Sequence, residues 1–222
     1  KSQEGHIHNQ LRFNAKGVAT LNKIKVSGAF LFSQSNIDSM NNTMSGTFDH
    51  FIPYYFLATK HGKYERQQYS ANTQIAYNIL PNRLAFGVGI QYHYNWMTRS
   101  VDPRPEVKSH ELLLKPELIG KFGNHSAGIK YIWGYGSDYT TLMFKNQLFT
   151  QSLSYPDRIY YNNQGYGFVS IKDQFARIFR TSAHQGIYLS YNYKGEQLDV
   201  HTSGSWTNIY HESSQTEAVK NR

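Results

Sequence analysis

The hydrophobic pattern is clearest in residues 83–96, where apolar and polar side chains alternate without interruption. One column holds Leu84, Phe86, Val88, Ile90, Tyr92, Tyr94 and Trp96, and the other holds Arg83, Ala85, Gly87, Gly89, Gln91, His93 and Asn95. Successive side chains of a β-strand point to opposite faces, so this pattern predicts a two-faced strand of about fourteen residues, well above the usual length of about five or six. The apolar column ends in aromatic residues, which is typical of a strand that crosses a membrane.

The same alternation recurs along the chain and predicts about nine strands. Residues 68–79 precede 83–96 with only Pro81 and Asn82 as the centre of the turn, which favours a hairpin. The other predicted strands cover residues 7–21, 24–32, 110–121, 126–135, 165–179, 186–193 and 198–210, and we expect the 165–179 strand to be interrupted around Lys172 and Asp173. Pro116 cannot donate a hydrogen bond to a neighbouring strand, so we expect a bulge or an unpaired position there.

Short turns and long connections fall on opposite sides of this predicted sheet. Turns at Asn22, Pro81 and Phe122 lie on one side. The long loops on the other side cover about 33–66, 97–109 and 136–164. Bacterial outer-membrane barrels have short periplasmic turns and long external loops, so the pattern predicts that orientation. The aromatic strand ends on the loop side then predict a membrane girdle, formed by Tyr92, Tyr94, Trp96, Tyr131, Trp133 and Tyr135.

Composition narrows the class of protein. The chain has 222 residues, of which 15% are aromatic and only 39% hydrophobic, and it has no cysteine. No run approaches the roughly twenty apolar residues of a membrane-spanning helix. The lack of cysteine excludes disulfides and zinc–thiolate sites. The net charge of +8 comes from dispersed Lys and Arg, so we expect no nucleic-acid partner. The first residues contain no apolar signal-peptide core, which we interpret as a mature sequence.

These features predict an all-β fold, namely an antiparallel, up-and-down transmembrane β-barrel, with residues 1–222 forming part of one domain. About nine strands is an odd number, whereas a closed bacterial barrel normally has an even number. Residues 213–222 also lack the aromatic end that is typical of a final barrel strand. We therefore expect this sequence to be the N-terminal part of a larger barrel.

Several short motifs carry a family resemblance. The order is Phe51-Ile52-Pro53-Tyr54-Tyr55, then Tyr64-Glu65-Arg66 with Tyr69, then the long hairpin, then Asp102-Pro103-Arg104-Pro105. This order, within about residues 26–193, resembles the N-terminal half of an uncharacterised family of Bacteroidota outer-membrane β-barrels, whose genes often lie beside TonB-dependent transporters. The resemblance implies a location and an architecture, and the family has no agreed activity to transfer.

The loop motif is the best candidate for a local structural role. In the run Asp102, Pro103, Arg104 and Pro105, two prolines stiffen the chain, and the carboxylate and the guanidinium can pair. We expect a structural brace rather than a ligand contact. The aromatic residues of the long loops can pack on the barrel, stack on a sugar or dock a partner protein, and we favour packing for Tyr54, Tyr55, Phe56, Tyr160 and Tyr161.

No motif in the sequence indicates catalysis or a cofactor. His6 and His8 are two residues apart, but no third ligand lies nearby, so we expect no metal site. Nothing in the spacing of His125, Ser137 and Asp138 selects them as a catalytic group, and the familiar nucleophile and metalloprotease motifs are absent. We expect no enzyme activity and no cofactor, and the sequence identifies no ligand-binding residue.

Two classes of function remain for a barrel in the bacterial outer membrane. The first is an accessory of a TonB-dependent nutrient-uptake complex, or a passive channel. The second is a structural or assembly-linked envelope subunit with a filled lumen. In both, the expected partners are outer-membrane lipid and other envelope proteins, such as a TonB-dependent transporter. An extracellular β-sandwich adhesin is the alternative outside the membrane.

Overall fold

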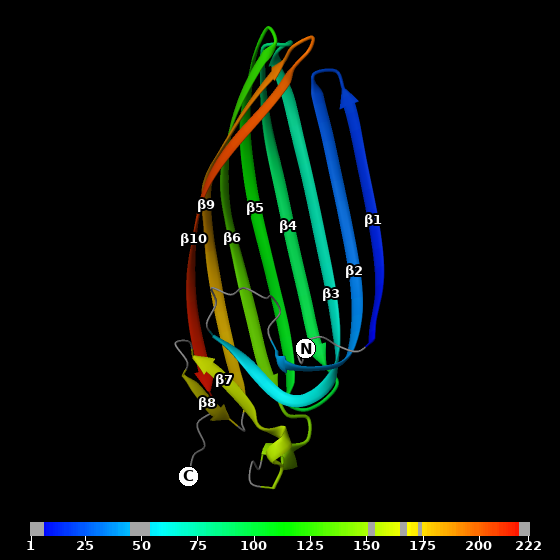
Figure 1. The fold of residues 1–222 in the computed structure, drawn as a ribbon, viewed down its shortest axis with the longest axis vertical. Coiled ribbons are helices and arrows are strands. Elements are labelled where there is room, and N and C mark those ends of the chain that lie inside the picture. Colours follow the sequence, from blue (N-terminus) through cyan, green and yellow to red (C-terminus); the bar gives the residue numbers. More distant parts are fainter. Residues whose placement is uncertain (1–6, 45–53, 151–153, 165–167, 173–174, 218–222) are drawn as a thin grey trace.

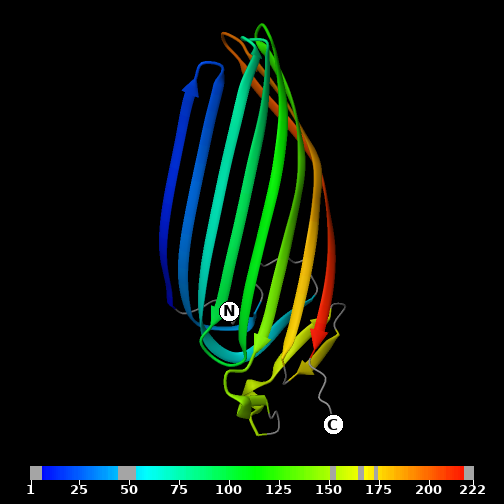
Figure 2. The same cartoon turned by 180° about the vertical axis from the view of Figure 1, so that it is seen from behind.

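The fold is one long, curved antiparallel sheet, seen from two sides in Figures 1 and 2. The computed structural model describes residues 7–44, 54–150, 154–164, 168–172 and 175–217. The strands are β1 (Ile7–Leu21), β2 (Ile24–Thr43), β3 (Tyr54–Leu80), β4 (Leu84–Arg99), β5 (Arg104–Phe122), β6 (His125–Met143), β7 (Tyr160–Gln164), β8 (Val169–Lys172), β9 (Ala176–Lys194) and β10 (Asp199–Glu217). Two short 3-10 helices, η1 (Gln147–Thr150) and η2 (Pro156–Arg158), lie between β6 and β7.

The strand order is that of an up-and-down meander. The main path runs β1-β2-β3-β4-β5-β6-β9-β10, and the short strands β7 and β8 extend from the start of β3. In Figure 1 the start of β3 runs across the lower end of the sheet, where it pairs with β7. Among the described residues, no helix is long and apolar enough to cross a bilayer. The prediction of an all-β, antiparallel fold is therefore confirmed.

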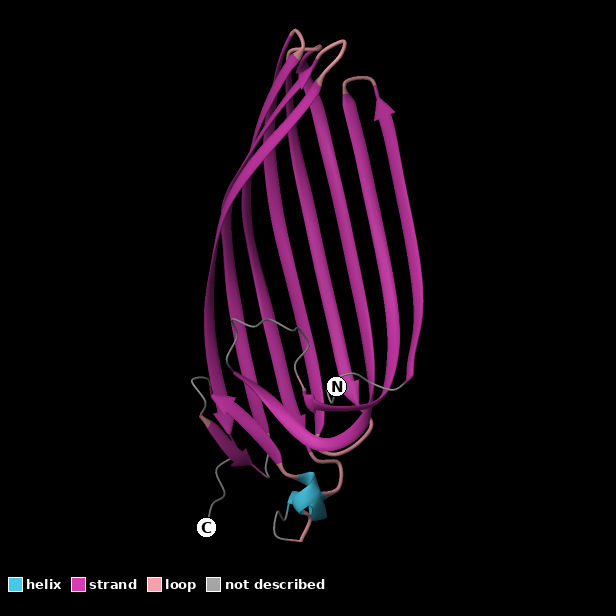
Figure 3. Ribbon diagram, in the orientation of Figure 1, coloured by secondary structure: helices cyan, strands magenta, loops and turns pink. Residues whose placement is uncertain are grey.

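The sheet is open along one side. Strands β1 and β10 are the two ends of the pairing order, and no pairing joins them in the described part of the chain. Figure 3 shows the same gap between the outer strands, with nearly all of the drawn ribbon in strand. The structure thus contains a wall curved like that of a barrel but not a closed barrel.

The four tight turns lie together at one end of the sheet, the upper end in Figure 1, which we call the turn end. Asn22 and Asn82 adopt positive φ angles of 52° and 58°, and Gly123 has 56°. Asn and Gly tolerate this left-handed conformation better than other residues, which explains why the chain reverses there. The turns predicted at 22–23, 81–82 and 122–124 are confirmed, and a fourth joins β9 to β10.

The three long loops predicted at 33–66, 97–109 and 136–164 are shorter in the structure, because strands extend into each of these ranges. Strands β2 and β3 extend into 33–66, so the break between them covers only residues 44–53, and the 97–109 connection shrinks to residues 100–103. Within 136–164, β6 continues to Met143, and two 3-10 helices and β7 follow. On β4, for example, the apolar side chains change face beyond residue 96 while the backbone pairing continues to Arg99. We call this opposite end of the sheet the loop end.

The two strands expected at 165–179 and 186–193 need correction in their bounds. Residues 186–193 are strand, but they belong to β9, which is continuous from Ala176 to Lys194, and β8 is a separate strand that ends at Lys172, where an interruption was expected. The expected unpaired position at Pro116 is confirmed, without a bulge. Pro116 keeps its register with Val88 of β4, whereas the pairing between β5 and β6 skips positions 115 and 116. A proline lacks the N–H that the β6 side requires, so it is unpaired on that side only.

The curvature of the sheet depends on glycines at inward positions. A Cβ added at Gly134 would lie 2.6 Å from the backbone oxygen of Leu112, and one at Gly186 would lie 2.8 Å from that of Trp206. Only glycine allows backbones to approach so closely. Gly134 lies on β6 and Gly186 lies on β9, and both strands are in the left half of the sheet in Figure 1.

Candidate functional site

The convex face of the sheet forms a mostly apolar surface. The strand registers place its outward columns within residues 11–21, 24–32, 69–77, 84–96, 112–122, 125–139, 179–193 and 200–210. None of the outward positions in these segments is Lys, Arg, Asp or Glu. A barrel strand crosses a membrane in about 9–11 residues, a length that these columns reach or approach. We call this surface the apolar band.

Aromatic side chains border the apolar band at both ends. Toward the loop end, the ring of Tyr69 lies 5.0 Å from that of Phe32 and 6.0 Å from that of Tyr94, centroid to centroid. Toward the turn end, the outward aromatic residues are Tyr77, Phe86, Phe122, Tyr191 and Tyr193. Aliphatic residues such as Ile75, Val88 and Ile90 lie between the two rows on β3 and β4. Aromatic rows that flank an aliphatic zone are the arrangement of a transmembrane barrel.

All six residues predicted for the girdle lie on the convex face. Tyr92 and Tyr135 both pair with Leu112 of the strand between them, so they lie at the same level of the sheet. Trp133 is 56% exposed, and Ile90, at the same level on β4, is 45% exposed. Tyr94 and Trp96 continue the column of β4, and Tyr131 that of β6. No second layer of the described residues covers them.

The polarity of the two faces reverses at the loop end. There the outward positions become polar or charged, including Glu65, Thr98, Glu106 and Lys108. The inward positions become apolar and buried: Tyr64, Met97 and Val107 are at most 3% exposed, and they pack with Met40 and Ile37. This is the arrangement of a strand whose outer face meets water. The same strands therefore present an apolar outer face in one zone and a polar outer face in the next.

A second buried cluster closes the loop end beside the first. It contains Met44, Phe56, Ala58, Leu142, Phe144, Tyr160, Ala176 and Ile178, with Phe149 packed against it. The rings of Phe56 and Tyr160 meet edge to face at 5.4 Å. Packing of these two predicted loop aromatics is observed, whereas Tyr54 is exposed and Tyr55 and Tyr161 are half-buried.

A buried arginine that the sequence did not indicate holds this end together. Arg99 is 1% exposed and donates hydrogen bonds from Nε to the carbonyl of Val101 at 3.0 Å and from Nη1 to that of Lys60 at 3.2 Å. Nη1 also donates to the Tyr64 hydroxyl at 3.3 Å. Gly62 leaves room for this side chain, because a Cβ there would lie 2.7 Å from Cδ of Arg99. Arg99 thus joins the end of β4 to the bend of β3.

The loop motif at 102–105 forms an internal brace. Nε of Arg104 donates to the Asp102 carboxylate at 2.7 Å, and the backbone amide of Asn146 donates to the other carboxylate oxygen at 3.0 Å. Both prolines, Pro103 and Pro105, are fully buried. Burial alone would raise the pKa of the Asp102 carboxyl, but the Asn146 amide and the Arg104 side chain outweigh it and lower the pKa below its ordinary value. The pair ties the β4–β5 loop to the segment after β6.

The concave face carries a network of polar and charged side chains. Glu117 accepts a hydrogen bond from Gln74 at 3.0 Å and lies 3.4 Å from Nζ of Lys130. Nearer the loop end, Arg180 lies 3.5 Å from Asp138, and His184 lies 3.5 Å from Glu111. These contacts join β3, β5, β6 and β9 across the inner surface.

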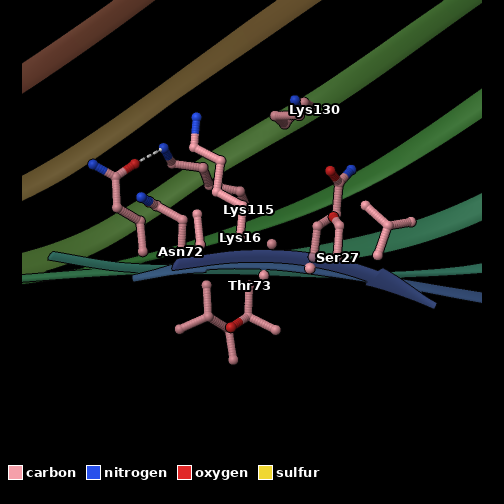
Figure 4. Close-up of a pocket in the computed structure, with 14 residues that line it drawn as sticks. Lys16, Ser27, Asn72, Thr73, Lys115 and Lys130 are labelled. Atoms are coloured by element: carbon pink, nitrogen blue, oxygen red, sulfur yellow. Dashed lines mark hydrogen bonds between the residues drawn. The ribbon is translucent and has the colours of Figure 1, made fainter. Parts of the chain in front are cut away.

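A cavity of about 350 Å³ lies against the sheet near the middle of the strands. Figure 4 shows Lys16, Asn72 and Lys115 projecting from the sheet on one side, and Thr73 on the opposite side. Lys130 lies on β6, on the part of the sheet that curves over this side. The side chains of this cavity are rich in hydrogen-bond donors, and its lining includes no carboxylate. We call it the lysine cavity.

The structure does not assemble the other candidate residues. Ser137 faces outward beside His110, at 3.2 Å from its Nδ1, whereas Asp138 faces inward, and His125 lies at the far end of the same strand. His6 lies outside the described residues, and His8 lies on β1. Within the described ranges, no group of three or more His, Asp or Glu side chains is placed to hold a metal ion.

The chain belongs to a protein family described as a family of unknown function, DUF6850, which matches residues 1–221. No curated protein matches the sequence.

Proposed function

We propose that this chain forms part of the wall of a β-barrel in the bacterial outer membrane, and that the barrel provides a polar passage for solutes. The observation that carries the proposal is the reversal of face polarity along the strands. An outward surface that is apolar and uncharged between two aromatic rows suits lipid, and the polar outward surface beyond it suits water. A sheet in water alone has no physical reason to reverse.

The open edges support a wall that other strands complete. In hydrocarbon, each unpaired backbone group costs several kcal/mol, so lipid-exposed sheet edges do not persist. Strands β1 and β10 are such edges within the described residues. In the described part of the chain the main path has eight strands where the sequence predicted about nine, so the open edges and not the strand number support this proposal. We propose that further strands pair with both edges and close a larger barrel.

The proposed orientation follows from the two ends of the sheet. The turn end has only tight turns and faces the periplasm. The loop end, which contains the buried clusters, faces the cell exterior. The family resemblance of the motifs makes a TonB-dependent transporter the partner to test first. The polar concave face and the lysine cavity favour a passage over a filled lumen, because the inner surface retains open space.

Single-cysteine labelling in intact outer membranes tests the membrane assignment. The chain has no cysteine, so each introduced thiol is the only one among its 222 residues. We expect Ile90→Cys to resist a water-soluble maleimide and a fluorophore on it to be quenched by a spin label on a lipid chain. The neighbouring variant Gln91→Cys, on the concave face, should react with the maleimide and escape the lipid quencher.

Thr98→Cys is the matched control, because it lies on the same strand and the same face as Ile90 but beyond the aromatic row. We expect it to label from water. If Ile90→Cys and Thr98→Cys label equally fast, the membrane assignment is wrong. Full-length protein that stays soluble without detergent would favour the extracellular adhesin instead.

Conductance separates the two barrel functions. Steady ion-permeable steps from purified full-length protein in planar bilayers are expected for a passage. Electrical silence, together with stable co-purification of an envelope partner, would favour the structural subunit.

A further inference from the structure

We propose that the lysine cavity is a binding site for small oxyanions, such as phosphate or carboxylate compounds, on the inner surface of the sheet. The inference deepens the proposed function, on which it rests, because it assigns a charge preference to the solute that passes. The Lys residues come from three separate strands, with Lys16 on β1, Lys115 on β5 and Lys130 on β6. Their convergence is thus a product of the fold and not of one local sequence.

The charges around the cavity do not balance. Lys130 and Gln74 both contact the Glu117 carboxylate, and Nζ of Lys130 also lies 5.2 Å from the ring centroid of Tyr188. Lys115 donates to the side-chain oxygen of Gln91, which is neutral. Within the described part of the chain, neither Lys16 nor Lys115 forms an ion pair. Three lysines against Glu117 and Glu111, the second of which attracts Lys115 without forming an ion pair, leave an excess of one positive charge at the cavity.

The donors have space in which to meet a ligand. Gly89 lies inward next to Lys115 and presents no side chain, and a Cβ there would lie 3.4 Å from the Cβ of Lys115. Asn72 and Gln91 add amide groups to the same surface. Ammonium and amide donors that reach the same space suit oxyanions, because charge-assisted hydrogen bonds to ionised oxygens are the strongest of their kind.

A cation fits less well. The cavity lining contains Lys but no Asp or Glu, so a metal ion would meet net repulsion. Rings of Lys or Arg are the usual device for selecting anions in pores. The expected consequence is that chloride and small oxyanions pass more readily than potassium.

Ion selectivity of the full-length protein tests the inference. In planar bilayers under a KCl gradient, we expect the reversal potential of the wild type to show anion preference. The double variant Lys16→Gln/Lys115→Gln should lose most of that preference. The control Lys63→Gln/Lys108→Gln removes the same charge from exposed positions at the loop end and should keep it. Cation preference in the wild type, or equal effects of both double variants, would overturn the proposal.

A binding measurement keeps the two proposals distinguishable. Calorimetric titration of the detergent-solubilised full-length protein with inorganic tripolyphosphate, and separately with citrate, needs no conductance. We expect saturable binding of at least one probe, weakened about tenfold or more by Lys16→Gln/Lys115→Gln, a loss of about 1.4 kcal/mol. Binding without conductance would reject the passage and keep the oxyanion site. Conductance without oxyanion binding and without anion preference would reject the oxyanion site and keep the passage.

Discussion

The apolar band and the loop end are built from the same strands but are stabilised in different ways. In the band, large apolar side chains point away from the sheet, and Phe86 is 42% exposed. At the loop end, the apolar side chains turn inward, and Phe56 and Leu142 are completely buried. One zone therefore relies on its surroundings to cover its apolar surface, and the other buries its own.

This difference indicates which part of the molecule gains free energy on folding by burying apolar surface within the chain. A single curved sheet without a packed second layer gains little from burial in water, whereas the buried clusters of the loop end gain about 25 cal/mol per Å² of apolar area removed from water. Arg99 and the Asp102 brace lie in the same end and fix its connections. The loop end is thus folded around its own buried core, whereas the sheet beside it leaves its apolar face uncovered by the described residues.

The largest expected difference in stability comes from replacing one phenylalanine by alanine at the loop end and one in the apolar band. Phe56→Ala removes a ring with no exposed surface, so we expect a loss of about 3–5 kcal/mol in the free energy of unfolding. Phe86→Ala removes a ring that is exposed on the apolar band and, under the proposed function, faces lipid, and we expect a loss of about 0.5 kcal/mol. Urea unfolding in lipid micelles, followed by tryptophan fluorescence, measures both. Equal losses would mean that a second protein layer covers the band.

An introduced charge tests the same contrast between the apolar band and the loop end. Ile90→Arg places a guanidinium in the middle of the apolar band, and we expect a loss of about 2–4 kcal/mol with reduced membrane assembly. Thr98→Arg, on the same column beyond the aromatic row, should change stability by less than about 0.5 kcal/mol. The amount of folded protein in outer-membrane fractions gives the first readout, and unfolding in micelles gives the second. A tolerated Ile90→Arg would contradict a lipid-facing surface.

The sequence predicted the apolar band better than the loop end, for a physical reason. Within 83–96 the apolar column keeps one phase, so strand, face and girdle could all be inferred. At Trp96 and Met97 the apolar residues shift from outward to inward, and two adjacent apolar positions interrupt the alternation. The strand continues through this shift because backbone pairing does not depend on which face is apolar. We therefore expected loops where the strands persist.

Other features of the structure could not be predicted because they depend on contacts between distant parts of the chain. Arg99 is fixed by Lys60 and Tyr64, which are 39 and 35 positions away, and no local pattern indicates that meeting. In β9 the outward run Thr181, Ala183 and Gln185 has little apolar character, so the continuous strand was divided into two. The lysine cavity likewise depends on three strands meeting across a curved sheet. Only Asp102 and Arg104, two residues apart, formed a pair that the sequence could predict.

The smallest effect that we predict concerns this brace and its dependence on pH. Asp102→Asn keeps an oxygen for the Asn146 amide but removes the charge opposite Arg104, so we expect a loss of about 1–2 kcal/mol near neutral pH. The pKa of Asp102 in the folded protein lies below its ordinary value of 3.8. The charged form is therefore favoured by folding, and its contribution is complete above the ordinary pKa and disappears as the pH falls through the folded value.

The difference in unfolding free energy between wild type and Asp102→Asn should accordingly stay constant at neutral pH and shrink below about pH 4. Asp157→Asn is the control, since its ion pair with Lys60 at 2.8 Å is half exposed and is expected to contribute at most about 0.5 kcal/mol. Denaturant titrations over a range of pH compare the three proteins. A difference for Asp102→Asn that grows on acidification would show that the carboxylate does not stabilise the loop end. The contrast between the loop end, which buries its own apolar side chains, and the exposed apolar band would then rest on apolar packing alone.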